Sequence, residues 1–408
     1  MSGQSHDSSP VPDGSQSVLA LVDSTCEQDR RFAAAFRLLQ EAVAHRVFPG
    51  AALVVARKGE LLAWKAFGNS TYATDAADET QSSSTKSQAE PAREPKRITR
   101  ETVWDLASLT KPIATTSMAM LLWQQRRLSL DAQVVALVPE FADAKGDEPG
   151  LRESKPRESV TVRMLLAHSS GLPAHRKLYQ HASGREAMVA AALRVPLAAA
   201  PMERAEYSDV GFIVLGELLE RVAGERIDSF CQREIFYPLK LTLNFCPETA
   251  GFIDIPPTVI DIDFRKRTVR CEVNDENAFA MGGVAGHAGL FGDALSVAGF
   301  AQCLLSGGQP LFQRETVELF TTRESLPRRT TRTLGWDTPS APSQSGTRFS
   351  PKSFGHLGYT GTSLWCDPDR GLSVTLLTNR TWPDGRNQAI KQVRPAVHDA
   401  IVGALDEG

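Results

Sequence analysis

The order in which apolar patterns change along the chain constrains its fold more than any other feature. Two apolar runs, at 51–56 and 61–67, are joined by a glycine turn and predict a strand hairpin. The spacing of apolar residues is then almost wholly helical from 108 to about 243. Strands return at 359–366 and 372–378. Both ends of the chain therefore supply strands, and we expect them to complete one sheet.

We predict an α+β fold in which an antiparallel sheet is flanked by N- and C-terminal helices, with an inserted all-helical subdomain. Apolar residues at helical spacing place the first helix near 32–43 and the last near 390–401, kinked at Pro395. A cleft between a sheet and a helical subdomain is a common place for a ligand pocket. We therefore expect the functional site where the chain passes from one to the other.

Composition sets the domain boundaries. Residues 1–26 are predicted to be a disordered tail, because the chain begins with a polar stretch rich in Ser, Pro and Gly. Residues 27–105 and 285–408 are assigned to the α/β sheet domain, and residues 106–284 to the mainly helical subdomain. Within the sheet domain, residues 69–100 are predicted to be a flexible, exposed insertion, since they include few apolar side chains.

The charge balance and the cysteines narrow the class of protein. The chain has 408 residues and a net charge of −3, without a long basic stripe, which argues against binding to nucleic acid or to a membrane surface. No segment has the pattern of a signal peptide or of a membrane-spanning helix. Six cysteines stand without the short spacing of a zinc or redox site. We expect a cytoplasmic protein that acts on a small molecule without a cofactor or metal, in an oligomeric state that the sequence does not define.

The stretch Trp104–Pro112 contains the pattern on which the functional prediction depends. If this stretch opens a helix, residues three apart share a face, so that the amine of Lys111 lies over the hydroxyl of Ser108. A serine hydroxyl is a weak nucleophile that needs a positioned base, and a neutral lysine amine can serve as that base. The pKa of Lys111 would then have to be lowered from about 10.4 to about 7 by burial and by cationic or hydrogen-bonding neighbours.

Residue spacing alone does not identify such a site. Ser83 and Lys86 have the same spacing inside a polar run that could not bury an amine, whereas apolar residues surround Ser108 on both sides. An ordinary helix start, with Ser108 as a cap and Lys111 in solvent, is the alternative for this stretch taken alone. Further motifs are needed to decide between the two.

Two further stretches favour the catalytic interpretation. Tyr207-Ser208-Asp209 precedes an apolar helix predicted at 210–222, and His356–Gly361 stands at the start of a predicted strand. Together with the Ser108 pair they resemble the Ser-x-x-Lys, Tyr-x-Asn and Lys-Thr-Gly elements of the penicillin-recognising serine hydrolases, in particular the class C beta-lactamase-like branch with its esterases and peptidases. The order of the elements matches, and the resemblance covers most of the chain.

The resemblance implies a role for each of these residues. It identifies Ser108 as the acylated nucleophile, Lys111 as its base and Tyr207 as the phenol that carries the proton to or from the leaving group and the hydrolytic water. The backbone N–H groups of Ser108 and Tyr359 would form the oxyanion hole. The residues that we expect to bind substrate are Asp209, His287, His356 and Gly358.

Two positions depart from the family pattern. Asp209 stands where the family often has asparagine, and His356 stands where penicillin-cleaving relatives have a lysine that holds the substrate carboxylate. A histidine is only partly charged at neutral pH, and an ionised Asp209 would repel a carboxylate. We therefore expect hydrolysis of penicillins to be slow or absent. Asp209 could also serve as a helix N-cap.

The glycine-rich run at 281–289 lacks the lysine and the strand-to-helix setting of a phosphate-binding loop, so we reject a nucleotide site. We expect its glycines to let the backbone approach the substrate closely, with His287 as the functional side chain of the run. His168 and His175 are interpreted as structural.

Together with Val273–Ala278, this run resembles the branch of the family that cleaves the amide between N-acetylmuramic acid and L-alanine. The resemblance implies a cytoplasmic amidase that acts on muropeptides in cell wall recycling, with neutral His287 and His356 as donors to the sugar and Asp209 as acceptor from the amide nitrogen. Two alternatives stay open: a carboxylesterase of the same fold, and a catalytically silent protein that only binds a ligand. The intact catalytic set favours an enzyme.

Overall fold

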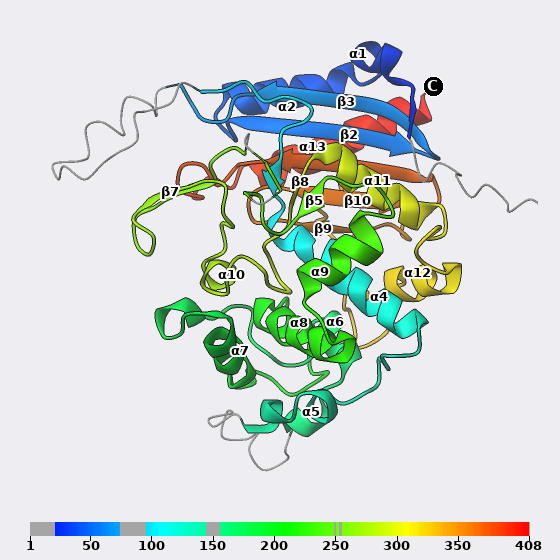
Figure 1. The fold of residues 1–408 in the computed structure, drawn as a ribbon. Helices are drawn as coiled ribbons and strands as arrows, with labels where there is room; N and C mark the ends of the chain where they lie inside the picture. Colours follow the sequence, from blue (N-terminus) through cyan, green and yellow to red (C-terminus); the bar gives the residue numbers. More distant parts are fainter. Residues whose placement is uncertain (1–20, 74–94, 144–155, 249, 253–254, 408) are drawn as a thin grey trace, which may run out of the picture.

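The computed structural model describes residues 21–73, 95–143, 156–248, 250–252 and 255–407. Its largest sheet has six strands in the order β1-β3-β2-β11-β10-β9. These strands are Val22–Asp23 (β1), Gly50–Arg57 (β2), Glu60–Gly68 (β3), Phe354–Leu357 (β9), Ser363–Asp367 (β10) and Leu372–Thr378 (β11). Because β2 pairs with both β3 and β11, the two ends of the chain complete one sheet, as predicted (Figure 1).

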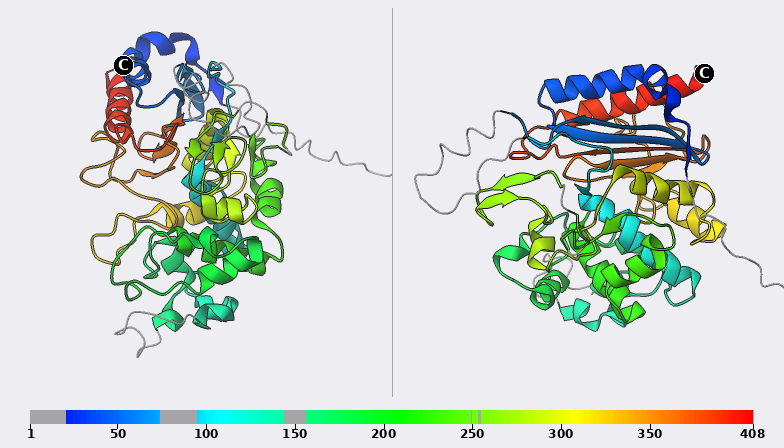
Figure 2. Two further views of the ribbon diagram at one scale, coloured as in Figure 1. Left: turned by 90° about the vertical axis from the view of Figure 1, so that its left-hand side faces the viewer. Right: turned by 45° about the horizontal axis from the view of Figure 1, so that its top comes forward.

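Helices cover both faces of this sheet. α2 (Ala33–Ala44) and α13 (Ile390–Asp406) pack against one another on one face, and α11 (Ala294–Leu305) lies on the other (Figure 2). Alternate residues of β2 point to opposite faces: Leu53 joins the core under α2 and α13, whereas Val54 joins the core shared with the helical region. The strand is buried on both faces, which explains its continuous apolar run.

The helical region lies on the α11 side of the sheet (Figure 1). Its longest helix, α8 (Asp209–Ala223), begins after the N-cap Ser208 and ends at Gly224 in the left-handed conformation, close to the predicted bounds. The region also contains α4 (Ser117–Gln124), α5 (Val134–Leu137), α6 (Val162–Leu166), α7 (Arg185–Leu193), α9 (Ile227–Cys231) and α10 (Glu276–Ala280). Outside it, α1 (Gln28–Arg31) precedes α2 and α12 (Arg314–Thr321) follows α11.

Two small sheets complete the fold. β4 (Trp104–Asp105), β8 (Phe291–Gly292) and β5 (Leu243–Asn244) form one, and β6 (Val259–Asp261) and β7 (Arg267–Val269) form the other. β5, β6 and β7 thus fall within the segment predicted as mainly helical. The division into domains stays a prediction.

Two predictions about the main sheet need correction. Val22 and Asp23, placed in the disordered tail, form β1, which pairs in parallel with β3, so the sheet is mixed rather than wholly antiparallel. The reason is that the edge of β3 is open to pairing. The backbone N–H of Val22 donates to the carbonyl of Gly59, just before β3, at 2.9 Å. The strand predicted at 359–366 begins only at Ser363, because a turn after β9 comes first.

Most of the predicted tail and of the predicted insertion at 69–100, with Ser83 and Lys86, lies outside the described residues. The described end of the insertion is part of the fold: Ile98 is 4% exposed, and its N–H donates to the Gly68 carbonyl at 3.1 Å. The six cysteines are free thiols. Within the described ranges, no helix combines the length and the apolar character needed to cross a bilayer.

Candidate active site

Ser108 lies at a sharp turn between the sheet and the helical region. The residue before it, Ala107, has a φ of 47°, a conformation that residues with a side chain rarely adopt. Asp105 holds this turn, because its Oδ1 accepts the N–H of Ala107 at 2.8 Å and its Oδ2 accepts the N–H of Asn274 at 2.6 Å. Ser108 is thereby fixed at the start of the segment that becomes α4.

The structure brings Ser108, Lys111 and Tyr207 into contact. Lys111 Nζ lies 3.0 Å from Ser108 Oγ, as the three-residue spacing suggested, and the Tyr207 hydroxyl donates to the same oxygen at 2.8 Å. Tyr207 comes from the loop before α8, far from Ser108 in the sequence. The Ser108 oxygen therefore contacts both groups that could move its proton.

Lys111 is fully buried, and all three of its N–H groups have partners. In addition to Ser108, Nζ donates to Asp209 Oδ1 at 2.7 Å and to the His287 carbonyl at 2.9 Å. Burial alone would lower the pKa of Lys111, but the charges of Asp209 and Tyr207 raise it above the ordinary lysine value. The expected neutral lysine is therefore wrong for the free protein, in which the amine is protonated.

Asp209 is responsible for this charge state. It is the first residue of α8, and Ser208 is the N-cap, so the alternative that Asp209 caps the helix is wrong. Burial would raise the pKa of Asp209, but the charge of Lys111 and the interaction with His175 hold it below its usual range. His175 Nδ1 lies 3.6 Å from Asp209 Oδ2, which makes this histidine part of the site rather than merely structural.

The glycine-rich run at 281–289 supports the lysine rather than the substrate. A Cβ on Gly286 would lie 2.2 Å from the backbone oxygen of Phe212 in α8, so this glycine lets the two backbones pack together and places the next carbonyl on the lysine. The His287 imidazole is 1% exposed, and its Nε2 lies 2.7 Å from Asp275 Oδ1. Neither Gly286 nor His287 is among the residues that line the cavity at Ser108, although Ala288 of the same run is, so the substrate-binding role predicted for His287 needs correction.

The turn after β9 carries Tyr359, the second residue predicted for the oxyanion hole. The hydroxyl of Thr360 donates to the Asp105 carbonyl at 2.8 Å, which ties this turn to the segment of the nucleophile. An added Cβ on Gly358 would lie 2.7 Å from the Leu106 oxygen, so only glycine lets the two segments approach this closely. The two backbone N–H groups predicted for the oxyanion hole therefore lie on adjoining segments.

His356 lines the cavity and is 4% exposed. Its Nδ1 lies 2.8 Å from the Leu357 oxygen, which can only accept, so Nδ1 carries the proton, and Nε2, which has no partner among the described residues, is an acceptor. Burial, and then the charges of Lys111 and Arg332, lower the pKa of His356 to about 3. An imidazole in this state is neutral, and its Nε2 can accept a hydrogen bond but cannot donate one, so the predicted role of His356 as a donor to the sugar needs correction.

Ser108, Tyr207, Asp209 and His356 line a cavity of about 1070 Å³. Most ligand pockets span roughly 300 to 1,000 Å³, so this one can hold a large small-molecule substrate. Acidic lining residues include Asp209, Asp261, Asp263, Asp275 and Glu276, and the basic ones are Lys177, Arg332, Arg380, Arg386, Lys391 and Arg394. The cavity therefore suits a substrate whose parts differ in charge.

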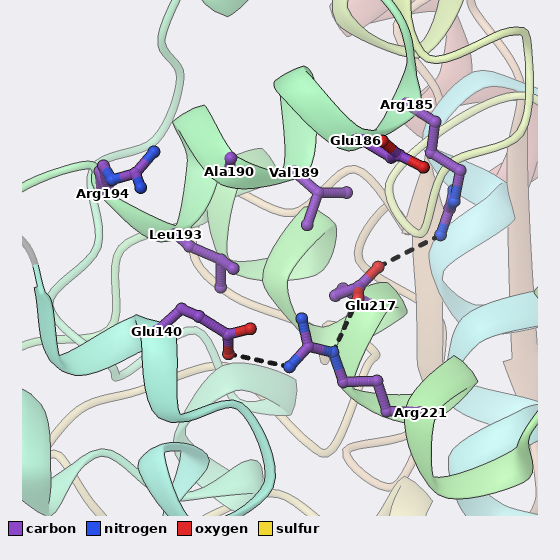
Figure 3. Close-up of a pocket in the computed structure, with 9 residues that line it drawn as sticks. All are labelled: Glu140, Arg185, Glu186, Val189, Ala190, Leu193, Arg194, Glu217 and Arg221. Carbon is purple, nitrogen blue, oxygen red and sulfur yellow. Dashed lines mark hydrogen bonds and ion pairs between the residues drawn. The ribbon is translucent and has the colours of Figure 1, made fainter.

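A smaller hollow of about 210 Å³ lies on the helical region, beside α7 and α8 (Figure 3). Four of its charged side chains pair with one another: Arg221 contacts Glu140 at 2.9 Å and Glu217 at 2.8 Å, and Arg185 contacts Glu217 at 3.5 Å. No predicted site residue is among those that line it. We assign no catalytic function to this hollow.

His175, Asp209 and Asp275 offer possible metal-ligand atoms within 4.8 Å of one another. Both carboxylates are already engaged, Asp209 by the Lys111 ammonium and Asp275 by His287. A cation beside Lys111 would be repelled by the ammonium. We therefore keep the prediction that the site uses no metal.

Asp209→Asn tests whether Asp209 sets the charge of Lys111. The substitution removes an interaction that raises the pKa of Lys111, so that pKa should fall. A protonated lysine cannot accept the Ser108 proton, and kcat/KM should rise with pH as the lysine loses its proton. We expect this rising limb, measured with a chromogenic ester, to move to lower pH by at least about one unit in the variant.

Asp131→Asn is the matched control, because Asp131 is an exposed carboxylate that pairs with Arg163 on the surface. Its pH profile should follow that of the wild-type protein. An unchanged profile in Asp209→Asn would show that another group defines the limb.

Comparisons with known proteins agree with the family resemblance of the sequence motifs. A protein-family model described as Beta-lactamase matches residues 35–397. The N-acetylmuramyl-L-alanine amidase of Bacillus subtilis (strain 168) is 31% identical over 361 residues, which cover 82% of this chain and 77% of that protein. A putative D-alanyl-D-alanine carboxypeptidase of Escherichia coli (strain K12) is 32% identical over 317 residues, which cover 70% of this chain and 71% of the relative.

Solved structures share the fold. EstCE1, a hydrolase with promiscuous acyltransferase activity, gives a TM-score of 0.69 at 22% identity over 91% of this chain and 99% of its own. The octameric penicillin-binding protein homologue from Pyrococcus abyssi gives 0.68 at 22% identity over 91% of this chain and 77% of its own. At these identities the likeness concerns the fold alone.

Proposed function

The chain belongs to the beta-lactamase family of serine hydrolases, and we propose that it cleaves the amide bond between N-acetylmuramic acid and L-alanine in small muropeptides derived from the cell wall. The relative from Bacillus subtilis, which is named for an activity of this kind, supports the choice. A cytoplasmic location, where muropeptides imported during cell wall recycling would be met, is part of the proposal.

The observation that carries the proposal is the size and charge of the cavity at Ser108. A cavity of about 1070 Å³ with acidic and basic walls holds far more than the acyl group of a short ester. A muropeptide joins an uncharged sugar to a peptide with carboxylates, so its two halves need different surroundings. The acidic and basic residues line the same cavity, so the basic ones can bind the peptide half of such a substrate.

In the proposed reaction, Ser108 Oγ attacks the lactyl carbonyl of the muramoyl group while deprotonated Lys111 takes the Ser108 proton. The backbone N–H groups of Ser108 and Tyr359 stabilise the oxyanion. Tyr207 then protonates the departing nitrogen of L-alanine, the C–N bond breaks, and the tyrosinate recovers a proton from Lys111. The muramoyl group stays as an ester on Ser108 until water, activated by the same residues, releases it.

Tyr207 has the charge state that amide cleavage needs. Burial, and then the charge of Asp209, raise the pKa of Tyr207 to about 12, so it is a phenol at neutral pH. Its hydrogen bond to Ser108 places this phenol beside the reacting carbon. An amine is a far poorer leaving group than an alkoxide unless it is protonated, so a positioned acid is worth more to an amidase than to an esterase.

A D-alanyl-D-alanine carboxypeptidase is the second candidate, because the relative from Escherichia coli is named as one. Such an enzyme must hold the terminal carboxylate of its substrate next to the bond that it cleaves, at the position of the family's lysine. Where penicillin-recognising relatives have Lys-Thr-Gly, this chain has His356-Leu357-Gly358, with a neutral imidazole and no side-chain hydroxyl. We therefore rank the carboxypeptidase below the amidase.

Three substrates decide between these functions. We expect N-acetylmuramoyl-L-alanyl-D-isoglutamine to be cleaved with a kcat/KM of about 10⁴ M⁻¹s⁻¹ or more. A peptide that ends in D-Ala-D-Ala and p-nitrophenyl butyrate, which tests the carboxylesterase alternative, should both be poorer substrates by at least about tenfold. Brisk ester hydrolysis without release of L-alanyl-D-isoglutamine would identify an esterase. Release of D-alanine would identify a carboxypeptidase. No turnover of any of the three substrates would favour a protein that only binds a ligand.

A further inference from the structure

Two buried arginines in the cavity have no acidic partner among the described residues. Arg394, in the second turn of α13, is 3% exposed, and Arg380, just after β11, is 7% exposed. Both line the cavity that contains Ser108, and within the described ranges neither forms an ion pair with a carboxylate. A buried charge without a counter-charge is costly, so the protein must gain something from keeping these two.

Neutral groups alone position Arg394. Its Nη1 donates to Gln344 Oε1 at 2.7 Å and its Nη2 to the Gly361 carbonyl at 3.4 Å, while its buried Nε has no partner in the described part of the chain. Burial, and then the charge of Arg380, lower the pKa of Arg394 to about 9. The guanidinium is thus held in place without the anion that a buried arginine ordinarily binds.

Arg380 borders the same turn. Its Cζ lies 4.6 Å from the centroid of the Tyr359 ring, and its Nη1 donates to the Gly385 carbonyl at 2.9 Å. Because Arg394 contacts Gly361 and Arg380 contacts Tyr359, both arginines lie next to the turn that carries the expected oxyanion donor. Lys391, at the start of α13, also lines this part of the cavity, and a helix N-terminus favours an anion.

The arginines Arg185 and Arg221 in the smaller hollow on the helical region differ from Arg380 and Arg394, because they have acidic partners (Figure 3). There Arg185 and Arg221 both face Glu217, so their charges are balanced within the protein. Arg380 and Arg394 are more deeply buried than that pair and lack such a glutamate. An anion from outside the chain would supply the missing charge.

We propose that Arg380 and Arg394 form a subsite for a carboxylate of the substrate that is not part of the reacting bond. The assignment to the peptide half rests on the proposed function, because the lactyl carboxyl of a muropeptide is used in the amide and the free carboxylates belong to the peptide. Charge-assisted hydrogen bonds to a guanidinium are strong, so the subsite would select acidic peptides over their amidated forms. A phosphate would offer the same charge, and the test includes it.

Binding of product-like peptides tests the subsite without turnover. In calorimetry on the wild-type protein, we expect L-alanyl-D-glutamate to bind at least about tenfold more tightly than L-alanyl-D-glutamine amide, which has the same amino terminus but lacks both carboxylates. Inorganic phosphate should bind more weakly than L-alanyl-D-glutamate. Equal affinities for the two peptides, or tight binding of phosphate alone, would overturn the assignment.

Variants then locate the effect. Arg394→Gln and, independently, Arg380→Gln should abolish the preference for the acidic peptide, whereas Arg394→Lys should keep part of it. Arg233→Gln is the matched control, because Arg233 is an exposed arginine that pairs with Glu225 and is not among the residues that line the cavity. A preference that survives both glutamine variants, or that Arg233→Gln removes equally, would refute the subsite.

Circular dichroism and thermal melting verify that each variant folds, and the wild-type comparison needs no variant at all. None of these measurements requires cleavage. A failed muropeptide assay would therefore refute the amidase proposal, while the subsite would still be judged by peptide binding.

Discussion

Ser108→Ala should lower kcat for the muropeptide roughly 10⁴- to 10⁶-fold and leave KM nearly unchanged. Lys111 Nζ and the Tyr207 hydroxyl both contact Ser108 Oγ, at 3.0 and 2.8 Å, and the alanine leaves these two groups without a nucleophile to activate. Substrate binding uses other residues, so the loss should fall on the chemical step. Peptide release in single-turnover experiments with excess protein measures this directly.

A fluorophosphonate probe provides an independent readout of the same residue. It should add one mass increment to the wild-type protein, on the peptide that contains Ser108, and none to Ser108→Ala. Ser83→Ala is the matched control, because Ser83 and Lys86 repeat the spacing of the catalytic pair inside a polar run. A label on another residue, or near-normal turnover by Ser108→Ala, would remove the mechanism.

Tyr207→Phe should have the second largest effect, and the effect should depend on the leaving group. We expect kcat/KM to fall roughly 10²- to 10⁴-fold for the muropeptide, because its amine must be protonated as it leaves. The loss for p-nitrophenyl butyrate should be much smaller, since p-nitrophenolate leaves without a proton. The ratio of the two losses, measured in one preparation, is the readout.

Tyr237→Phe is the control, because Tyr237 is an exposed tyrosine at the surface. It should change neither rate. Equal losses on both substrates in Tyr207→Phe would contradict a role as general acid and would restrict Tyr207 to the activation of Ser108.

The parts of the fold that depend on local patterns could be predicted from the sequence. The apolar run of β2, the hairpin with β3 and the amphipathic pattern of α8 determine these elements directly. β1 and β9 were missed, since each is short and depends on the edge of a neighbouring strand. The break between β9 and β10 depends on contacts with residues before Ser108, which no local pattern contains.

The contact between Ser108 and Lys111 could be predicted for a similar reason, whereas the charge of the lysine could not. The spacing of Ser108 and Lys111 is local, but the ammonium depends on Asp209, which lies 98 residues later. Neither His175 nor Arg394 belongs to a sequence motif. His175 is part of the site only through its contact with Asp209, and the sequence shows Arg394 only as a polar residue of the last helix. Long-range charge pairing therefore sets the limit of what the sequence predicts.

If the protein is the proposed amidase, Ser108 must carry the muramoyl group and never the peptide. The most direct measurement is rapid quenching of the wild-type protein during turnover of N-acetylmuramoyl-L-alanyl-D-isoglutamine, followed by digestion and mass spectrometry. We predict that the peptide with Ser108 gains the mass of an N-acetylmuramoyl group as L-alanyl-D-isoglutamine is released. An adduct that contains L-alanine, or an adduct on any other residue, would contradict this mechanism.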